Sequence, residues 1–165
     1  REIRHIIICK LSNAETLKKW DAIRNGQRFA PSREVLPLVT TVWGQHCYYN
    51  EQCPADLAGP CGHVWTGCVA TSMAQIMEYH NFPPRGVGQH TYNCPDYGQQ
   101  TADFENTYYD WSSMADSLTG SNPAVATLMY HAGVAVDMVY SPFGSGADGS
   151  ITPWVLMNYF NFWAT

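Results

Sequence analysis

The chain has 165 residues, which is long enough for one domain with a sizeable hydrophobic core. Its formal net charge is −5 and only 14% of its residues are charged, so it has no basic excess and no nucleic acid is expected as a partner. No apolar run approaches the length that spans a membrane, so no membrane partner is expected either.

The first 35 residues have a pattern of their own. Residues 4–9 form a short apolar run that predicts a strand. Residues 12–15 match a capping box, and residues 16–24 continue as a predicted amphipathic helix that Asn25 and Gly26 terminate. The inward face of this helix is expected to carry Leu17, Trp20 and Ile23.

An apolar segment, residues 36–45, ends in Gln45, whose side-chain amide is a hydrogen-bond donor. A cysteine that attacks an amide carbonyl creates a tetrahedral oxyanion, which needs donors already pointing at it. Backbone N–H groups at a helix start supply one donor, and a nearby glutamine would supply another. The alternative is an ordinary glutamine in a surface loop, so Gln45 by itself is a weak signal.

Cys68 follows a glycine and opens a predicted helix over residues 68–80, which residues 81–84 end with two prolines. Helix N-termini carry unpaired N–H groups and a positive dipole end, and these stabilise a thiolate, the nucleophilic form of cysteine. Cys68 is therefore the leading candidate for catalysis, and a buried core cysteine is the alternative. The packed face of the helix is expected to consist of Val69, Met73, Ile76, Met77 and His80.

The second half of the chain is expected to alternate loops with regular elements. Residues 84–110, rich in glycine, proline, tyrosine and asparagine, predict a long irregular connection. A helix is predicted over residues 123–133 and a strand over residues 134–140. The glycine-rich loop of residues 141–150 lacks the Gly-Lys-Ser/Thr ending of a phosphate loop, which argues against nucleotide binding. A last helix is predicted over residues 152–159.

A collinear series of short motifs runs through this chain between residues 37 and 160. They include Trp43-x-Gln45, Thr66-Gly67-Cys68-Val69-Ala70-Thr71, Met73-Ala74-Gln75-Ile76-Met77, Gly86-x-Gly88-x-His90-x-Tyr92 and Val134-Ala135-Val136-Asp137-Met138-x-Tyr140. In these motifs the chain resembles the streptopain family of papain-like cysteine peptidases. Their common order makes the resemblance far more specific than any single motif.

The resemblance implies a fold and a site. The implied fold is α+β and papain-like, and this chain would carry mainly the helical lobe that bears the nucleophile. Cys68 is implied to be the nucleophile and Gln45 the oxyanion-hole side chain, acting on protein or peptide substrates. The glycine-rich loop is implied to line the substrate cleft through Gly144, Ser145, Gly146 and Ala147.

The resemblance also divides the chain into two parts. Family members are made as zymogens, and their mature portion begins near the segment that matches residues 35–37. Residues 1–35 are therefore predicted to be the tail of a pro-segment with its activation linker, and residues 36–165 the first lobe of the peptidase domain. An ordinary N-terminal subdomain is the alternative for residues 1–35. A secreted or cell-surface bacterial protein is expected.

The chain has six cysteines. One interpretation leaves Cys68 reduced, places Cys9 outside the mature domain and pairs the other four, whose three possible connectivities the sequence cannot separate. The alternative is a zinc site, but nothing reads as Cys-x-x-Cys, so no metal or cofactor is expected. The four cysteines are Cys47, Cys53, Cys61 and Cys94, and the zinc alternative would use Cys47, Cys53, Cys61 and His63.

No histidine of the chain fits the general base of the family, which lies in a Gly-His-Ala segment C-terminal to the cysteine. We therefore expect the second, histidine-bearing lobe on the C-terminal half of the same precursor or on a second chain, and we expect this chain alone to be inactive. The predicted function is a secreted bacterial cysteine endopeptidase. The alternatives are a non-catalytic binding protein that retains the lobe, and a cysteine-rich structural or metal module.

Overall fold

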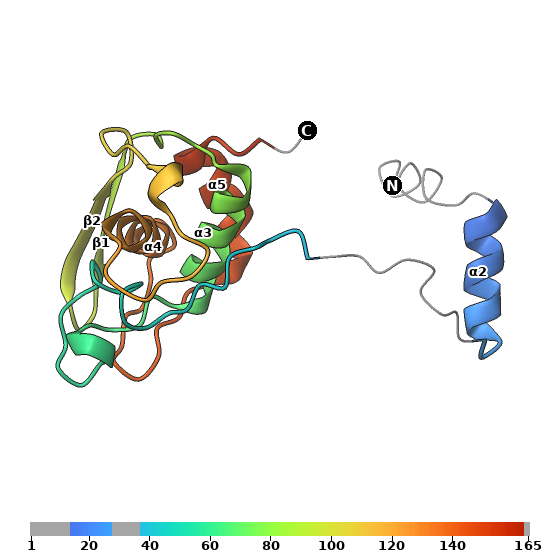
Figure 1. The fold of residues 1–165 in the computed structure, drawn as a ribbon, viewed down its shortest axis with the longest axis horizontal. Coiled ribbons are helices and arrows are strands. Elements are labelled where there is room, and N and C mark those ends of the chain that lie inside the picture. The colour runs from blue at the N-terminus through green and yellow to red at the C-terminus, as the bar shows by residue number, and fades with distance from the viewer. Residues whose placement is uncertain (1–13, 28–36, 164–165) are drawn as a thin grey trace. The chain divides into compact units, whose positions relative to one another are not determined.

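The computed structural model describes residues 14–27 and 37–163 (Figure 1). The chain divides into two units, residues 1–37 and residues 38–165. The strand predicted at residues 4–9 lies outside the described residues. No helix in the two described stretches is long and apolar enough to cross a membrane.

Helix α2 (Ala14–Arg24) belongs to the first unit and forms where a helix was predicted. Gly26, in the left-handed conformation with φ 78°, ends it and donates its N–H to the Ile23 carbonyl at 3.0 Å. Ser12, which opens the predicted capping box, lies outside the described residues. The predicted inward face of α2 is wrong, because its three apolar side chains are exposed. The side chains concerned are 54%, 57% and 50% exposed: Leu17, Trp20 and Ile23.

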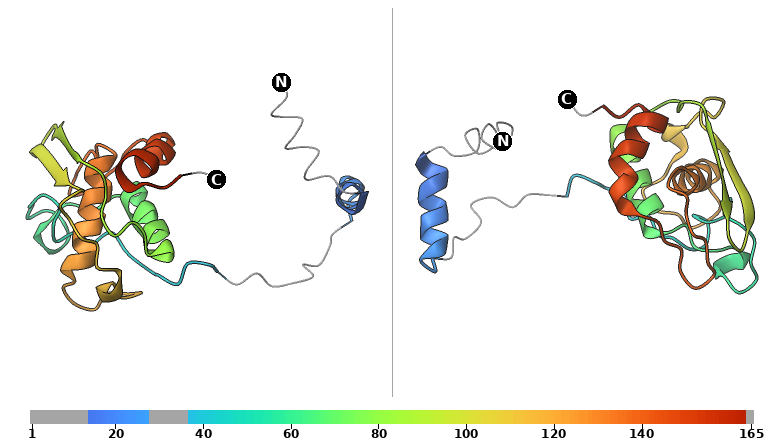
Figure 2. Two further views of the ribbon diagram at one scale, coloured as in Figure 1. Left: turned by 90° about the horizontal axis from the view of Figure 1, so that it is seen from above. Right: turned by 180° about the vertical axis from the view of Figure 1, so that it is seen from behind.

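The second unit is built around one central helix. Figures 1 and 2 show α4 between a two-stranded sheet on one side and α3 with α5 on the other, and α4 contacts α3 and both strands. The two strands pair antiparallel as a hairpin. The elements are α3 (Cys68–His80), β1 (Gln89–Cys94), β2 (Gly98–Asp103), α4 (Pro123–Ala135) and α5 (Thr152–Phe160), with short 3-10 turns at Pro60–Gly62, Trp111–Ser113 and Gly149–Ile151.

The core forms on every side of α4. The face of this helix that carries Val125, Leu128, Met129 and Ala132 is completely buried, and so are large side chains of α3, α5 and the connections. Each fully buried leucine, methionine or phenylalanine side chain contributes about 1.5–3 kcal/mol to folding. These buried residues are Met73, Met77, Phe104, Val125, Leu128, Met129, Ala132 and Phe160.

The irregular connection predicted for residues 84–110 is wrong at its centre, where the hairpin of β1 and β2 forms. Its strands are mostly polar, and one side carries the paired hydroxyl groups of Thr91 and Thr101, 2.9 Å apart. Only a few positions, such as Cys94 and Ala102, are buried. The usual alternation of apolar residues is therefore too weak to indicate strands from the sequence.

The predicted boundary between helix and strand at Gly133 is also wrong. α4 continues through Gly133 to Ala135. Of the strand predicted over residues 134–140, only Val139 pairs, in an isolated bridge with Gly146. The cause is the central position of α4: its last turn is buried on all sides, so an apolar run there has no polar face that would mark it as helical.

Helix α3 has the predicted bounds and ends at Asn81, which adopts the left-handed conformation with φ 48°. Its buried face is rotated from the predicted one. Ile76 is 41% exposed, and His80 lies at the surface with its ring edge-on to Phe162, 5.7 Å between centroids. The buried residues of the helix are Ala70, Thr71, Met73, Ala74 and Met77.

Candidate active site

Cys68 is the first residue of α3, and its thiol is free and exposed. The preceding Gly67 has φ 89° and ψ 142°, a backbone conformation that is almost restricted to glycine. A Cβ on Gly67 would lie 2.5 Å from Met138 Sδ and 3.3 Å from the Ser145 carbonyl oxygen. The turn and the close packing therefore both require glycine, and they present the thiol at the surface. The alternative of a buried core cysteine is wrong.

The N-terminus of α3 is open. No side chain caps it, so the backbone N–H groups of its first turn remain available to a ligand at the positive end of the helix dipole. Thr71 closes the turn from the inner side, because its N–H and its hydroxyl both donate to the Gly67 carbonyl, at 3.1 and 3.0 Å. The result is a rigid helix start that carries a thiol and suits an anion.

Gln45 is half-buried and lies on the segment beside this helix start. Its carbonyl accepts a hydrogen bond from the Thr66 N–H at 3.1 Å, two residues before Cys68. Trp43 fixes the same segment, since its indole is buried and donates to the Ala115 carbonyl at 2.7 Å. This backbone hydrogen bond therefore holds the Gln45 backbone next to Thr66, two residues before Cys68.

A disulfide between Cys47 and Cys61 ties together the loop that connects these two segments. Inside the loop Asn50 is completely buried and donates to the Pro60 carbonyl at 2.8 Å and to the Val64 carbonyl at 3.1 Å. A crosslink that closes a loop of this size stabilises a protein by roughly 3 kcal/mol. The disulfide and the asparagine together hold the Gln45 segment in place.

The predicted pairing of four cysteines is wrong for two of them, because Cys53 and Cys94 are buried free thiols. Burial raises the pKa of Cys53 to about 12, so its thiol stays neutral and unreactive. The zinc alternative is wrong as well, since Cys47 and Cys61 are bonded to each other and the Nδ1 atom of His63 lies 2.8 Å from the Cys53 carbonyl oxygen. In the described stretches no three acidic, histidine or cysteine side chains come together as a metal site.

The glycine-rich loop lies against the residues that precede Cys68. The Ser145 carbonyl approaches Gly67, and the backbones of Val139 and Gly146 exchange two hydrogen bonds, at 2.9 and 3.1 Å. Of the four predicted substrate-binding residues, Ser145 therefore lies next to the thiol-bearing turn, and Gly146 is paired with Val139. All four are exposed or half-buried: Gly144, Ser145, Gly146 and Ala147.

Trp65 belongs to the site although the sequence reasoning missed it. Its backbone N–H donates to the Ser141 carbonyl at 3.4 Å, and its indole N–H donates to the Pro142 carbonyl at 2.9 Å. It thus anchors the start of the glycine-rich loop beside Cys68. A tryptophan three residues before the thiol was the available signal, because a half-buried indole N–H needs an acceptor.

In the described part of the chain no histidine ring is hydrogen-bonded to Cys68, and each ring has other neighbours. The prediction that the general base comes from elsewhere therefore stays a prediction. The neighbours are Trp65 for His46, the Cys53 carbonyl for His63, Phe162 for His80, Asp137 for His90 and Tyr109 for His131.

The chain matches a known protein family over most of its length. A model of the peptidase C10 family matches residues 43–165, which include Gln45, the whole of α3 and the glycine-rich loop. This chain belongs to the peptidase C10 family. The C10 match begins at Trp43, so it covers the second unit and not α2.

Two bacterial proteins are relatives of this C10 chain. Streptopain of Streptococcus pyogenes is 37% identical over 100 residues, which cover 53% of this chain and 25% of streptopain. The thiol protease/hemagglutinin PrtT of Porphyromonas gingivalis is 30% identical over 160 residues, which cover 86% of this chain and 18% of PrtT. The C10 chain therefore spans only a minor part of each of these relatives.

Two solved structures resemble its fold. Active wild-type interpain A, a cysteine protease of Prevotella intermedia, gives a TM-score of 0.69 at 42% identity and covers 77% of this chain and 55% of interpain A. A prointerpain A fragment gives a TM-score of 0.67 at 37% identity, with 85% and 50% covered. The family and the α+β, papain-like fold class predicted from the sequence are confirmed, and the chain belongs to a family of bacterial cysteine peptidases.

Proposed function

We propose that this chain carries the nucleophile half of a cysteine endopeptidase, with Cys68 as the nucleophile. The observation that supports this most directly is the exposed, free thiol at an uncapped helix start, held there by a glycine that admits no side chain. Membership in the C10 family supports the same reaction class.

The reaction begins when the Cys68 thiolate attacks the carbonyl carbon of a peptide bond and the π electrons move to the oxygen. The backbone N–H of Cys68 and the side-chain amide of Gln45 donate to this oxyanion. The C–N bond then breaks, and the leaving amine takes its proton from a histidine that accepted the thiol proton. Water hydrolyses the resulting thioester, which releases the acid and restores the thiol.

The histidine in this proposal comes from outside the chain, on the C-terminal half of the same precursor or on a second chain. The isolated chain is therefore inactive. Protein or peptide substrates lie along the glycine-rich loop of Gly144, Ser145, Gly146 and Ala147. The Gly146 backbone is already paired with Val139, so an extended peptide pairs with the backbone groups of the neighbouring Ser145 and Ala147. Trp65 keeps this loop in place.

A secreted or cell-surface bacterial protein made as a zymogen accounts for two further features. The disulfide between Cys47 and Cys61 is typical of proteins that fold in an oxidising compartment. Residues 1–35 are the tail of a pro-segment and its activation linker. Helix α2, with its exposed apolar side chains, is the described part of that segment.

Replacement of the nucleophile tests the proposal in a molecule that also contains the histidine-bearing half. We expect Cys68→Ser to reduce hydrolysis of unfolded casein by at least about a thousandfold. Cys94→Ala, which removes a buried thiol away from the site, is the matched control and keeps the activity. If Cys68→Ser remains active, Cys68 is not the nucleophile. If Cys68 resists alkylation in that molecule and the molecule does not hydrolyse casein, the chain is a non-catalytic binding protein.

The isolated chain offers a second test. Iodoacetamide near pH 7.5, followed by peptide mapping, is expected to label Cys68 in the folded chain and to label Cys53 and Cys94 only after unfolding, because these two are buried. Casein hydrolysis is expected to stay at background. Turnover by the isolated, Cys68-dependent chain would contradict the assignment of the base to another part of the molecule.

A further inference from the structure

We propose that His90 is a positioning residue of this site: through Asp137 it fixes the turn that packs under Gly67 and anchors the glycine-rich loop. The importance of this turn for catalysis rests on the proposed function. The mechanical link itself rests only on contacts among described residues.

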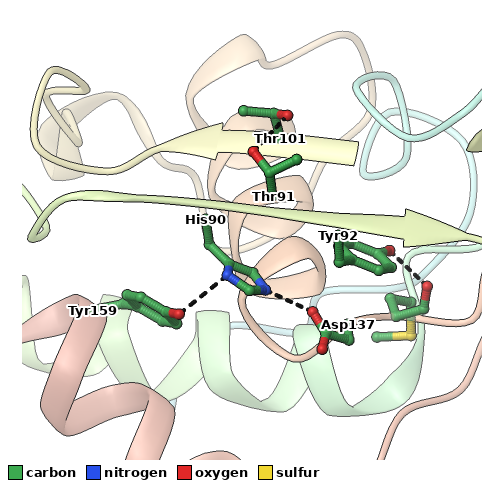
Figure 3. Close-up of polar contacts among 7 residues, drawn as sticks. His90, Thr91, Tyr92, Thr101, Asp137 and Tyr159 are labelled. Atoms are coloured by element: carbon green, nitrogen blue, oxygen red, sulfur yellow. Dashed lines mark hydrogen bonds and ion pairs between the residues drawn. The ribbon is translucent and has the colours of Figure 1, made fainter. Parts of the chain in front are cut away.

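His90 joins three elements (Figure 3). It lies on β1, its Nε2 is 2.6 Å from Asp137 Oδ1, and its Nδ1 is 3.1 Å from the Tyr159 hydroxyl of α5. A carboxylate only accepts hydrogen bonds, so Nε2–H is the donor to Asp137 and Nδ1 accepts from Tyr159 when the ring is neutral. The ring also stacks on Tyr92, with 8° between the planes. Both ring nitrogens of His90 are thus hydrogen-bonded to side chains of other elements.

Asp137 is held in a conformation that glycine usually provides. Its φ is 51°, and it occupies the left-handed position of a Schellman motif that ends α4. The Met138 N–H donates to the Gly133 carbonyl and the Asp137 N–H to the Val134 carbonyl, both at 3.1 Å. Aspartate tolerates this conformation better than most residues other than glycine, and here its carboxylate is also the partner of His90.

The two residues after Asp137, Met138 and Val139, contact the two parts of the site. Met138 is completely buried, and its sulfur packs against Gly67, the residue before Cys68. The Val139 backbone pairs with Gly146 of the glycine-rich loop.

Tyr92 supports the same turn from β1, where alternate residues share one side of the strand. Its hydroxyl donates to the Met138 carbonyl at 2.6 Å. In Figure 3 His90 and Tyr92 lie toward Asp137, whereas Thr91 points toward Thr101. His90 and Tyr92, on one side of β1, therefore hold the turn at Asp137 and Met138 in place. The same turn positions the Met138 side chain against Gly67 and pairs Val139 with the glycine-rich loop.

Hydrogen exchange of individual backbone amides tests this link without any need for catalysis. In His90→Ala we expect the Val139 and Gly146 amides, which form the bridge, to exchange about fivefold faster, as loss of one net hydrogen bond implies. The amides in the middle of α3 should keep their protection. His90→Gln, which can still donate to Asp137, should restore most of the protection at the bridge.

Thr91→Ala is the matched control, because it removes a side-chain hydrogen bond from the same strand on the other side. It should leave the Val139 and Gly146 amides unchanged. If His90→Ala leaves the bridge as protected as Thr91→Ala does, the proposal is wrong. The same holds if exchange accelerates equally throughout the unit, because that would indicate general destabilisation.

Asp137→Gly covers the case in which His90→Ala does not fold. Glycine suits the left-handed position, so this variant keeps the end of α4 and removes only the partner of His90. We expect the same local acceleration at the bridge, and normal protection there would overturn the proposal. If the exchange pattern appears but Cys68→Ser leaves proteolysis intact, the proposed function fails and the positioning role of His90 remains.

Discussion

Helices α3 and α4 have the same length of 13 residues and end in the same way, yet they begin differently. Each ends at a left-handed residue that is not glycine, Asn81 after α3 and Asp137 after α4. In both, the next N–H reaches back to close the last turn: Phe82 to the Met77 carbonyl at 3.1 Å, and Met138 to that of Gly133. The ends of the two helices are equivalent, so their different roles arise at their starts.

The start of α4 is closed and the start of α3 is open. Asn122 caps α4, with its side-chain oxygen accepting from the Val125 N–H at 3.1 Å, and Pro123 follows. Before α3 stands Gly67, which offers no side chain to the first turn. The capped helix forms the core, whereas the uncapped one leaves its N–H groups to a ligand. A missing cap thus marks the helix start at which we propose that the reaction takes place.

Gly67→Ala should have the largest effect on stability, because it changes the residue that precedes the uncapped start of α3. The added Cβ meets the buried Met138 side chain and forces a conformation that alanine avoids. We expect a loss of about 3 kcal/mol in the free energy of unfolding, measured by urea denaturation. Gly120→Ala is the matched control, since a Cβ there meets nothing within 4 Å. Equal stability of the two variants would contradict the packing role of Gly67.

Low pH should lower the free energy of unfolding because of His131, a buried residue of the capped helix α4. Burial lowers the pKa of His131 to about 4, below its ordinary value of 6.5. The unfolded state therefore binds the proton first, so the contribution is complete above about pH 6.5 and disappears as the pH falls toward 4, at most about 3 kcal/mol. Urea denaturation across this range measures it. His131→Gln should flatten this part of the profile, and an unchanged slope would rule out His131 as its source.

Asn122→Ala should have a smaller effect on stability, because it removes only the side-chain cap of α4. Loss of the cap is expected to lower the free energy of unfolding by about 1 kcal/mol, measured by urea denaturation. The rate at which iodoacetamide modifies Cys68 should not change. Asn122→Asp keeps an acceptor and should retain most of the stability. A change in Cys68 reactivity in the alanine variant would show that the two helix starts are coupled.

Asn81→Gly should have the smallest effect, because it changes one of the two equivalent ends. Glycine relieves the left-handed strain but makes the unfolded chain more flexible, and asparagine already tolerates this conformation, so the free energy of unfolding should change by less than about 0.5 kcal/mol. Thermal unfolding checks this. A loss well above that value would mean that the Asn81 side chain has a role beyond ending the helix.

The sequence predicted the local elements whose signals are local. A glycine before a thiol, an apolar face and two prolines predicted the bounds of α3, and Asn122 with Pro123 predicted the start of α4. The hairpin of β1 and β2 was missed because its strands are polar. The end of α4 was misplaced because a central helix has no polar face.

The site divides in the same way. The motifs around Cys68 and Gln45 sufficed to predict the family, which the C10 match confirms, and to nominate both residues. Only the tertiary structure decided that the thiol is exposed, that Thr66 pairs with Gln45, and that Trp65 and Met138 support the site. The physical reason is the separation along the chain over which each interaction acts. Caps, turns and periodic patterns act within a few residues, whereas the packing of Met138 on Gly67 and the bond from His90 to Asp137 join segments that meet only after the chain has folded.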